Sequence, residues 1–131
     1  MTAEKNEPPY RTRLCVHRND ASDADPALIT DLQALNQRGQ SDATTKAIEL
    51  MDQLRQLGPD APRKHLVGRI FELKARVPSG GVRVYFARLN ATEFLMGRAE
   101  CKKEDEADPR LLNWFAEVLA DLDQGHTNLL R

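Results

Sequence analysis

Charged or polar side chains recur at every second position in two neighbouring segments of the chain. Lys74 and Arg76 follow Glu72 in the first segment, and Arg83 and Tyr85 alternate with apolar residues in the second. Alternate residues of a β-strand point to the same face of a sheet, so these five side chains are expected on one open, polar face. Like charges that face each other across a sheet destabilise it by roughly 0.2–1 kcal/mol. We therefore interpret this face as a binding site for an anion. The alternative is a water-exposed face on which Glu72 pairs with Lys74 or Arg83.

The charge of the chain is distributed unevenly along its 131 residues. The net charge is −3 for residues 1–62, +7 for 63–103 and −5 for 104–131, although the whole chain carries only −1. A basic block of this density produces a local field that attracts polyanions such as RNA. The acidic segments on either side limit that attraction for the molecule as a whole.

The composition predicts one soluble domain. With 40% hydrophobic and 30% charged residues, the 131-residue chain has ordinary globular composition and can build one core. Residues 1–9 contain no apolar segment of the kind found in secretory signals, and no apolar run is long enough to cross a bilayer. These features predict a cytoplasmic protein with no membrane partner.

Cysteine and histidine are too sparse to suggest a metal or redox site. Cys15 and Cys101 are the only cysteines, and we expect them as reduced, packed thiols. His17, His65 and His126 are far apart in the sequence and form no ligand cluster. The sequence therefore implies no metal and no cofactor.

The spacing of apolar residues predicts an α+β fold. Apolar residues recur at helical spacing after Asp25-Pro26 and Asp108-Pro109, where an oxygen-bearing cap precedes a proline. From about residue 69 the period changes to two, as in strands. The expected strands are 10–17, 69–77, 82–89 and 92–99, and the expected helices are 26–37, 42–57 and 109–124.

This order, βααβββα, predicts a small, mostly antiparallel sheet packed by an N-terminal helical hairpin and a C-terminal helix. The hairpin follows from the short link between the first two helices, which makes them antiparallel neighbours. We assign residues 1–9 to a flexible tail, 10–125 to a single domain and 126–131 to a C-terminal tail.

Three motifs follow one another in and around the basic block. They are Lys64-His65-Leu66-Val67-Gly68-Arg69-Ile70-Phe71-Glu72-Leu73-Lys74, then Gly81-Val82-Arg83-Val84-Tyr85-Phe86, then Cys101-Lys102-Lys103. In order and spacing they resemble the RelE/ParE toxin superfamily, and within it the HigB-like, phage-derived branch. The resemblance covers about residues 60–122. The expected element order agrees with the RelE-like βααβββα fold of that family.

The resemblance implies the toxin component of a bacterial type II toxin–antitoxin system. Such a toxin is an endoribonuclease (an mRNA interferase) that cleaves mRNA, usually on the ribosome, and so inhibits translation. The implied chemistry is metal-independent: the 2′-OH attacks the adjacent phosphate, helped by a base, by cations and by an acid. The implied partners are a cognate antitoxin, expected to be a helix-turn-helix protein, and the mRNA.

The resemblance also implies roles for individual residues. Arg83 would clamp the phosphate, since its planar fork suits two phosphate oxygens at once. Lys74, on the preceding strand, would act as the base, and Lys102 or Lys103 as an acid or electrophile. Tyr85 would either stack on an RNA base or lie half-buried in the sheet. The full set of expected RNA contacts is Glu72, Arg76, Tyr85 and Arg98.

The chain departs from the family pattern in two places. Glu104, Asp105 and Glu106 follow the lysine pair, where relatives continue with Thr and a Pro-Glu-Ile run. The C-terminal Tyr or His of many relatives also has no clear counterpart. Two alternatives therefore stay open: a ParE-like, non-hydrolytic inhibitor that binds DNA gyrase, and a toxin-fold binding protein that is catalytically inactive.

Overall fold

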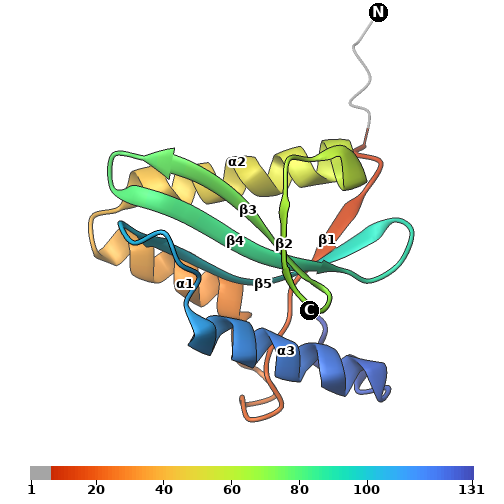
Figure 1. Ribbon diagram of the computed structural model, residues 1–131. Helices are drawn as coiled ribbons and strands as arrows, with labels where there is room; N and C mark the ends of the chain where they lie inside the picture. The colour runs from red at the N-terminus through yellow and green to blue at the C-terminus, as the bar shows by residue number, and fades with distance from the viewer. Residues whose placement is uncertain (1–6) are drawn as a thin grey trace, which may run out of the picture.

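A five-stranded mixed sheet forms the centre of the computed structural model, which describes residues 7–131. Its strands are β1 (Arg11–Arg13), β2 (Lys64–Val67), β3 (Ile70–Val77), β4 (Gly80–Arg88) and β5 (Glu93–Lys102). They lie in the order β1-β5-β4-β3-β2, with β1 parallel to β5 and all other neighbours antiparallel (Figure 1). The helices are α1 (Ala27–Gln37), α2 (Ser41–Leu57) and α3 (Pro109–Asp123), and short 3-10 turns cover Gly58–Asp60 and Thr127–Leu129.

The predicted α+β class is confirmed, and so is the run of three consecutive antiparallel strands across residues 69–101. The element order differs from the predicted βααβββα by one strand, because β2 precedes β3. β2 lies at the edge of the sheet, and most of its residues are exposed. It therefore has no buried apolar face whose period could reveal it in the sequence.

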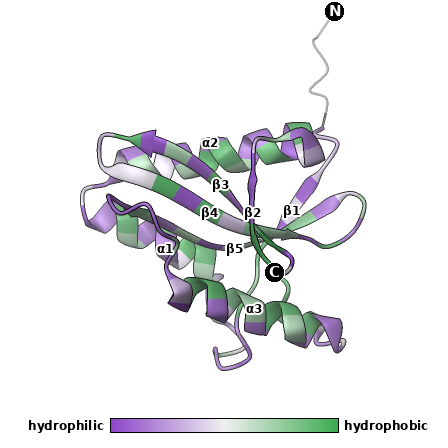
Figure 2. Ribbon diagram, viewed as in Figure 1, coloured by the Kyte–Doolittle hydropathy of each residue, from purple (hydrophilic) through white to green (hydrophobic). Residues whose placement is uncertain are grey.

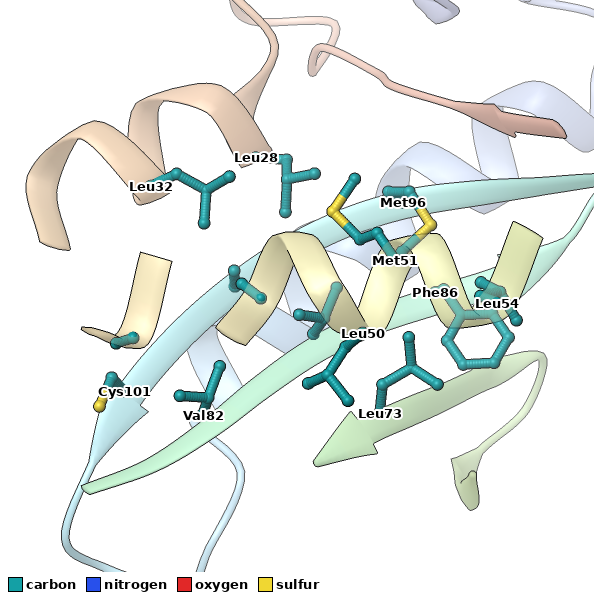
Figure 3. Packing of buried hydrophobic residues seen from close by; sticks show 14 of the residues in the cluster. Leu28, Leu32, Leu50, Met51, Leu54, Leu73, Val82, Phe86, Met96 and Cys101 are labelled. Carbon is teal, nitrogen blue, oxygen red and sulfur yellow. The ribbon is translucent and has the colours of Figure 1, made fainter. Parts of the chain in front are cut away.

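One face of the sheet packs against α1 and α2. Leucines and a methionine of the helices pack against apolar residues of β3, β4 and β5. Both cysteines are buried and free, as predicted. The central contacts involve Leu28, Leu32, Leu50, Met51, Leu54, Leu73, Val82, Phe86 and Met96 (Figure 3). Fully burying one such side chain contributes about 1.5–3 kcal/mol. This core holds the helical hairpin on the sheet and leaves the opposite face for the polar residues.

The opposite face of the sheet is covered at one end by α3, so that α2 and α3 lie on opposite sides of the sheet (Figure 1). Tyr85 and Leu95 of the sheet pack there against Phe115, Val118 and Leu119 of the helix. Hydrophilic and hydrophobic residues alternate along β3 and β4 (Figure 2), as the period of two predicts. The face predicted to be open is thus partly buried under α3.

The C-terminal end of the chain differs from the predicted tail. Of the expected flexible tail, residues 1–6 lie outside the described residues, and residues 7–9 are exposed and belong to no helix or strand. The expected C-terminal tail is wrong, because Leu14 and Arg131 exchange backbone hydrogen bonds of 3.2 and 2.8 Å. Leu129 is buried in the core beneath α3. Residues 126–131 therefore belong to the domain; the segment is too short to show an apolar period.

The helices begin in two different ways. At α3 the prediction is confirmed, since the Asp108 side chain accepts a hydrogen bond from the backbone N–H of Arg110 at 2.9 Å. At α1 the prediction is wrong, because Pro26 is the capping residue and no side chain makes a capping hydrogen bond. Among residues 7–131, no helix combines the length and the apolar character needed to cross a membrane.

Gly97 lies where β5 meets α3, and we predict that it tolerates no larger side chain. A Cβ atom at this position would lie 2.6 Å from the ring of Phe115. Because the ring is buried and cannot move away, Gly97→Ala should lower the free energy of unfolding by about 1–3 kcal/mol, as measured by urea denaturation. In Gly97→Ala/Phe115→Leu the loss should be smaller than the sum of the two single losses. Additive losses would contradict the steric cause.

Candidate functional site

Beyond the end covered by α3, the same sheet face carries a group of charged side chains, here called the charged face. Its members are Glu72, Lys74, Arg76, Arg83, Glu100 and Lys102, from β3, β4 and β5. In the sheet register Lys74 lies directly opposite Arg83, and Arg83 lies directly opposite Glu100. Strand alternation therefore brings the predicted site residues of β3 and β4 together.

Arg83 is buried, although the sequence predicted an exposed side chain. Only 3% of its side chain is accessible to solvent. Nη1 donates to Oε2 of Glu72 at 2.9 Å, and Nη2 donates to Oδ1 of Asp105 at 3.2 Å. Within residues 7–131, Nε has no hydrogen-bond partner. The burial arises because β4 is flanked by strands on both sides and because the connection after β5 reaches the same guanidinium group.

Asp105 lies between the two cations that were predicted to act on a phosphate. Its Oδ1 atom accepts hydrogen bonds from both Nζ of Lys74 and Nη2 of Arg83. The hydrogen bond and the charge of Lys74, with a smaller effect of Arg83, hold the pKa of Asp105 below the usual aspartate range. The carboxylate, with 79% of its side chain exposed to water, is therefore charged at neutral pH. The acidic run that departs from the family pattern thus supplies a ligand to the site.

Tyr85 is fully buried, so the predicted stacking on an RNA base is wrong. Its hydroxyl group donates to Oε2 of Glu100. Burial, and then the hydrogen bond to Glu100, raise the pKa of Tyr85 well above its usual range. Glu100 also accepts from the backbone N–H of Asp108 at 3.0 Å and pairs with Nζ of Lys102 at 3.3 Å. Glu100 therefore ties the start of α3 to the sheet and compensates the charge of Lys102.

Arg98 makes contacts that leave it no role at the charged face. Its Nε and Nη2 atoms donate to Oδ2 and Oδ1 of Asp31 at 2.8 and 2.9 Å. Its guanidinium carbon lies 4.9 Å from the centroid of the Trp114 ring. Asp31 also accepts from the backbone N–H of Ala99 at 2.9 Å. Arg98 thus joins β5 to α1 and α3. Its predicted contact with RNA is not part of the site at the charged face.

A cavity of about 260 Å³ adjoins Lys74 at the edge of the sheet. It is lined by Pro62, Arg63, Lys64, Glu72 and Lys74. Arg63 and Lys64 were not predicted as site residues, because the strand β2 was not predicted. Lys64 is the first residue of β2, and Arg63 precedes it. The available signal was the position of Lys64 in the first motif, since this residue lies opposite Glu72 in the sheet.

Two other predicted residues, Arg76 and Lys103, are exposed at the surface. Neither side chain forms an ion pair with the buried Arg83 and Glu72. In the part of the chain that is described, no group of three or more His, Cys, Asp or Glu is placed to hold a metal ion. The groups that the site offers to an anion are ammonium and guanidinium groups, which bind phosphate oxygens through charge-assisted hydrogen bonds and stabilise developing negative charge.

We predict that Arg83→Ala destabilises the fold by about 3–5 kcal/mol, because Glu72 would remain buried without its counter-ion. The double variant Glu72→Gln/Arg83→Met should recover most of this loss, since neutral side chains of similar size need no counter-ion. Urea denaturation of the wild type, Arg83→Ala and the double variant measures the difference. Equal losses in Arg83→Ala and in the double variant would mean that charge pairing does not explain the burial.

Comparison with known proteins assigns no family to this chain. No protein-family model matches it, and the comparison with curated proteins gives no match. The functional proposal below therefore rests on the resemblance of the motifs and on the geometry of the charged face.

Proposed function

We propose that this chain is the toxin component of a bacterial type II toxin–antitoxin system and acts as a metal-independent mRNA endoribonuclease that inhibits translation. In this proposal the fold is the RelE-like βααβββα fold with β2 added at the sheet edge. The proposed partners are mRNA, in the context of the ribosome, and a cognate helix-turn-helix antitoxin. An acidic segment of that antitoxin would cover the charged face and so compete with RNA.

One observation carries the proposal: Lys74 and Arg83, from neighbouring strands, both bind the same oxygen of Asp105. A carboxylate oxygen resembles a phosphate oxygen in charge and in hydrogen-bond acceptance. The two cations are therefore already placed to hold one oxygen of a phosphodiester. Lys64 and Arg63, at the neighbouring cavity, lie where the RNA backbone on one side of that phosphate could continue.

The proposed reaction is an internal transfer of the phosphate. The 2′-oxygen loses its proton to a base and bonds to phosphorus, while the bond to the 5′-oxygen breaks and that oxygen is protonated by an acid. The products are a 2′,3′-cyclic phosphate and a 5′-hydroxyl. Arg83 would stabilise the charge on the equatorial oxygens. Because Lys74 is ion-paired with Asp105, we assign it to charge stabilisation as well, in place of the base. The proton of the 2′-OH would then pass to a water molecule at the exposed side of the site.

The acid must come from the exposed side of the site. Lys102 and Lys103 remain the proposed acids, as the resemblance implied, because Lys102 is the last residue of β5, the strand beside that of Arg83, and Lys103 follows it. Lys102 is held by Glu100 at 3.3 Å, whereas Lys103 is exposed. Arg76, exposed at the end of β3, would bind the RNA backbone.

A second candidate is a toxin-fold binding protein without catalysis. The specific observation in its favour is the occupation of the site: Arg83 is buried and both cations already have a carboxylate partner. In such a protein the charges would stabilise the fold, and a partner would bind elsewhere. The two candidates differ in whether RNA is cleaved.

Expression of this chain alone in bacteria should arrest translation, and co-expression of an antitoxin encoded by the neighbouring gene should restore growth. The measurement is incorporation of labelled methionine after induction, with the Lys74→Met variant as the inactive control. If protein synthesis continues while DNA supercoiling collapses, the gyrase inhibitor replaces the ribonuclease as the function.

Lys74→Met should lower the rate of RNA cleavage about a hundredfold, because it removes one charge-assisted contact to the phosphorane. Since Lys74 is exposed, the free energy of unfolding should change by about 0.5 kcal/mol or less. This separation makes Lys74 a sharper test than the buried Arg83. Cleavage of mRNA on translating ribosomes, with a thermal melt of the same sample, measures both quantities.

Arg88→Ala is the matched control. Arg88 lies on the other face of β4, where it donates to the backbone oxygens of Asn90 and Ala91 at 3.0 and 2.7 Å. This variant also removes one positive charge, but it should cleave RNA at the wild-type rate. Equal loss of activity in both variants would point to overall charge and would remove Lys74 from the mechanism.

A further inference from the structure

The connection between β5 and α3, residues 103–107, is here called the acidic loop. We propose that Asp105 of this loop is an internal competitor of the ligand: it closes the Lys74–Arg83 site, and a phosphate group binds by displacing it. The identification of RNA as the natural ligand rests on the proposed function. The competition between Asp105 and phosphate does not depend on it.

The hydrogen bonds of Arg83 show that Asp105 fills the site incompletely. The Nε and Nη2 atoms of a guanidinium group donate in parallel from one edge. At Arg98 both atoms are used, by the two oxygens of Asp31 at 2.8 and 2.9 Å. At Arg83, Nη2 donates to one oxygen of Asp105 at 3.2 Å, while the buried Nε has no partner in residues 7–131.

An anion with two oxygens in one plane would satisfy this edge as Asp31 satisfies Arg98. The phosphate group of RNA has two non-bridging oxygens, and inorganic phosphate has more. One oxygen could remain between Lys74 and Arg83, while the second accepts from Nε. The unpaired, buried N–H of Arg83 therefore points to a ligand that offers one oxygen more than Asp105 supplies.

The acidic loop is built so that Asp105 can leave without loss of the fold. Its two ends are held, at Lys102 by pairing with Gly81 and at Asp108 by the hydrogen bond from its backbone N–H to Glu100. Between them, Lys103 to Glu106 are exposed and belong to no helix or strand. The ion pair between Asp105 and Lys74 is exposed, and exposed ion pairs are weak, so a ligand phosphate can replace this contact.

The test is a titration of the full chain with inorganic phosphate at pH 7 and constant ionic strength, followed by the NMR signal of the Arg83 Nε–H group. Asp105→Asn should bind phosphate about tenfold more tightly than the wild type, as expected if the loop is closed in about 90% of molecules. Glu104→Gln removes the same charge from an exposed neighbour in the loop and should change the affinity less than twofold. Adding Lys74→Met to Asp105→Asn should abolish the gain.

The outcomes separate this inference from the proposed function when RNA cleavage is measured on the same samples. Unchanged affinity in Asp105→Asn, or an equal gain in Glu104→Gln, would overturn the competitor role, even if the wild type cleaves RNA. A tenfold gain in phosphate affinity without any RNA cleavage would keep the competitor role and reject the ribonuclease.

Discussion

The buried ion pair between Arg83 and Glu72 is the interaction on which the charged face depends. Both side chains lie almost entirely out of water in the middle of the sheet, so neither charge could remain there without the other. The pair also holds the guanidinium group in one orientation. Its Nη1 atom is used by Glu72, which leaves the edge formed by Nε and Nη2 for the acidic loop or for a ligand. A donor fixed in this way needs no reorganisation when an anion binds.

The two faces of the sheet have different roles in the fold. The apolar core under α1 and α2 stabilises the sheet, whereas α3 closes one end of the other face. Close approach of α3 depends on Gly97, where any side chain would collide with Phe115. Glu100 then links the start of α3 to Tyr85 and Lys102. The position of the helix thus decides how much of the charged face remains accessible.

Repulsion within the basic block is relieved by carboxylates inside the protein. Arg83 pairs with Glu72, Lys74 with Asp105 and Lys102 with Glu100. The alternative to an anion-binding face was a water-exposed face on which Glu72 pairs with Lys74 or Arg83. The pair with Arg83 is present, although it is buried. What that alternative did not include is the contribution of Asp105, from the acidic segment that follows the basic block. The net charge that this face presents to the solvent therefore depends on whether this segment stays in place.

The pattern of apolar residues was enough to predict which residues share a face and where the main elements lie. The period of two placed Glu72, Lys74 and Arg83 on one side of the sheet, because side-chain direction in a strand follows from backbone geometry alone. The edge strand β2 was not predicted, since an exposed strand has no apolar period. The burial of Arg83 and Tyr85, and the contact of Asp105 with two cations, become visible only in the folded chain. Those contacts join residues far apart in the chain, and the local period identifies a face without specifying what covers it.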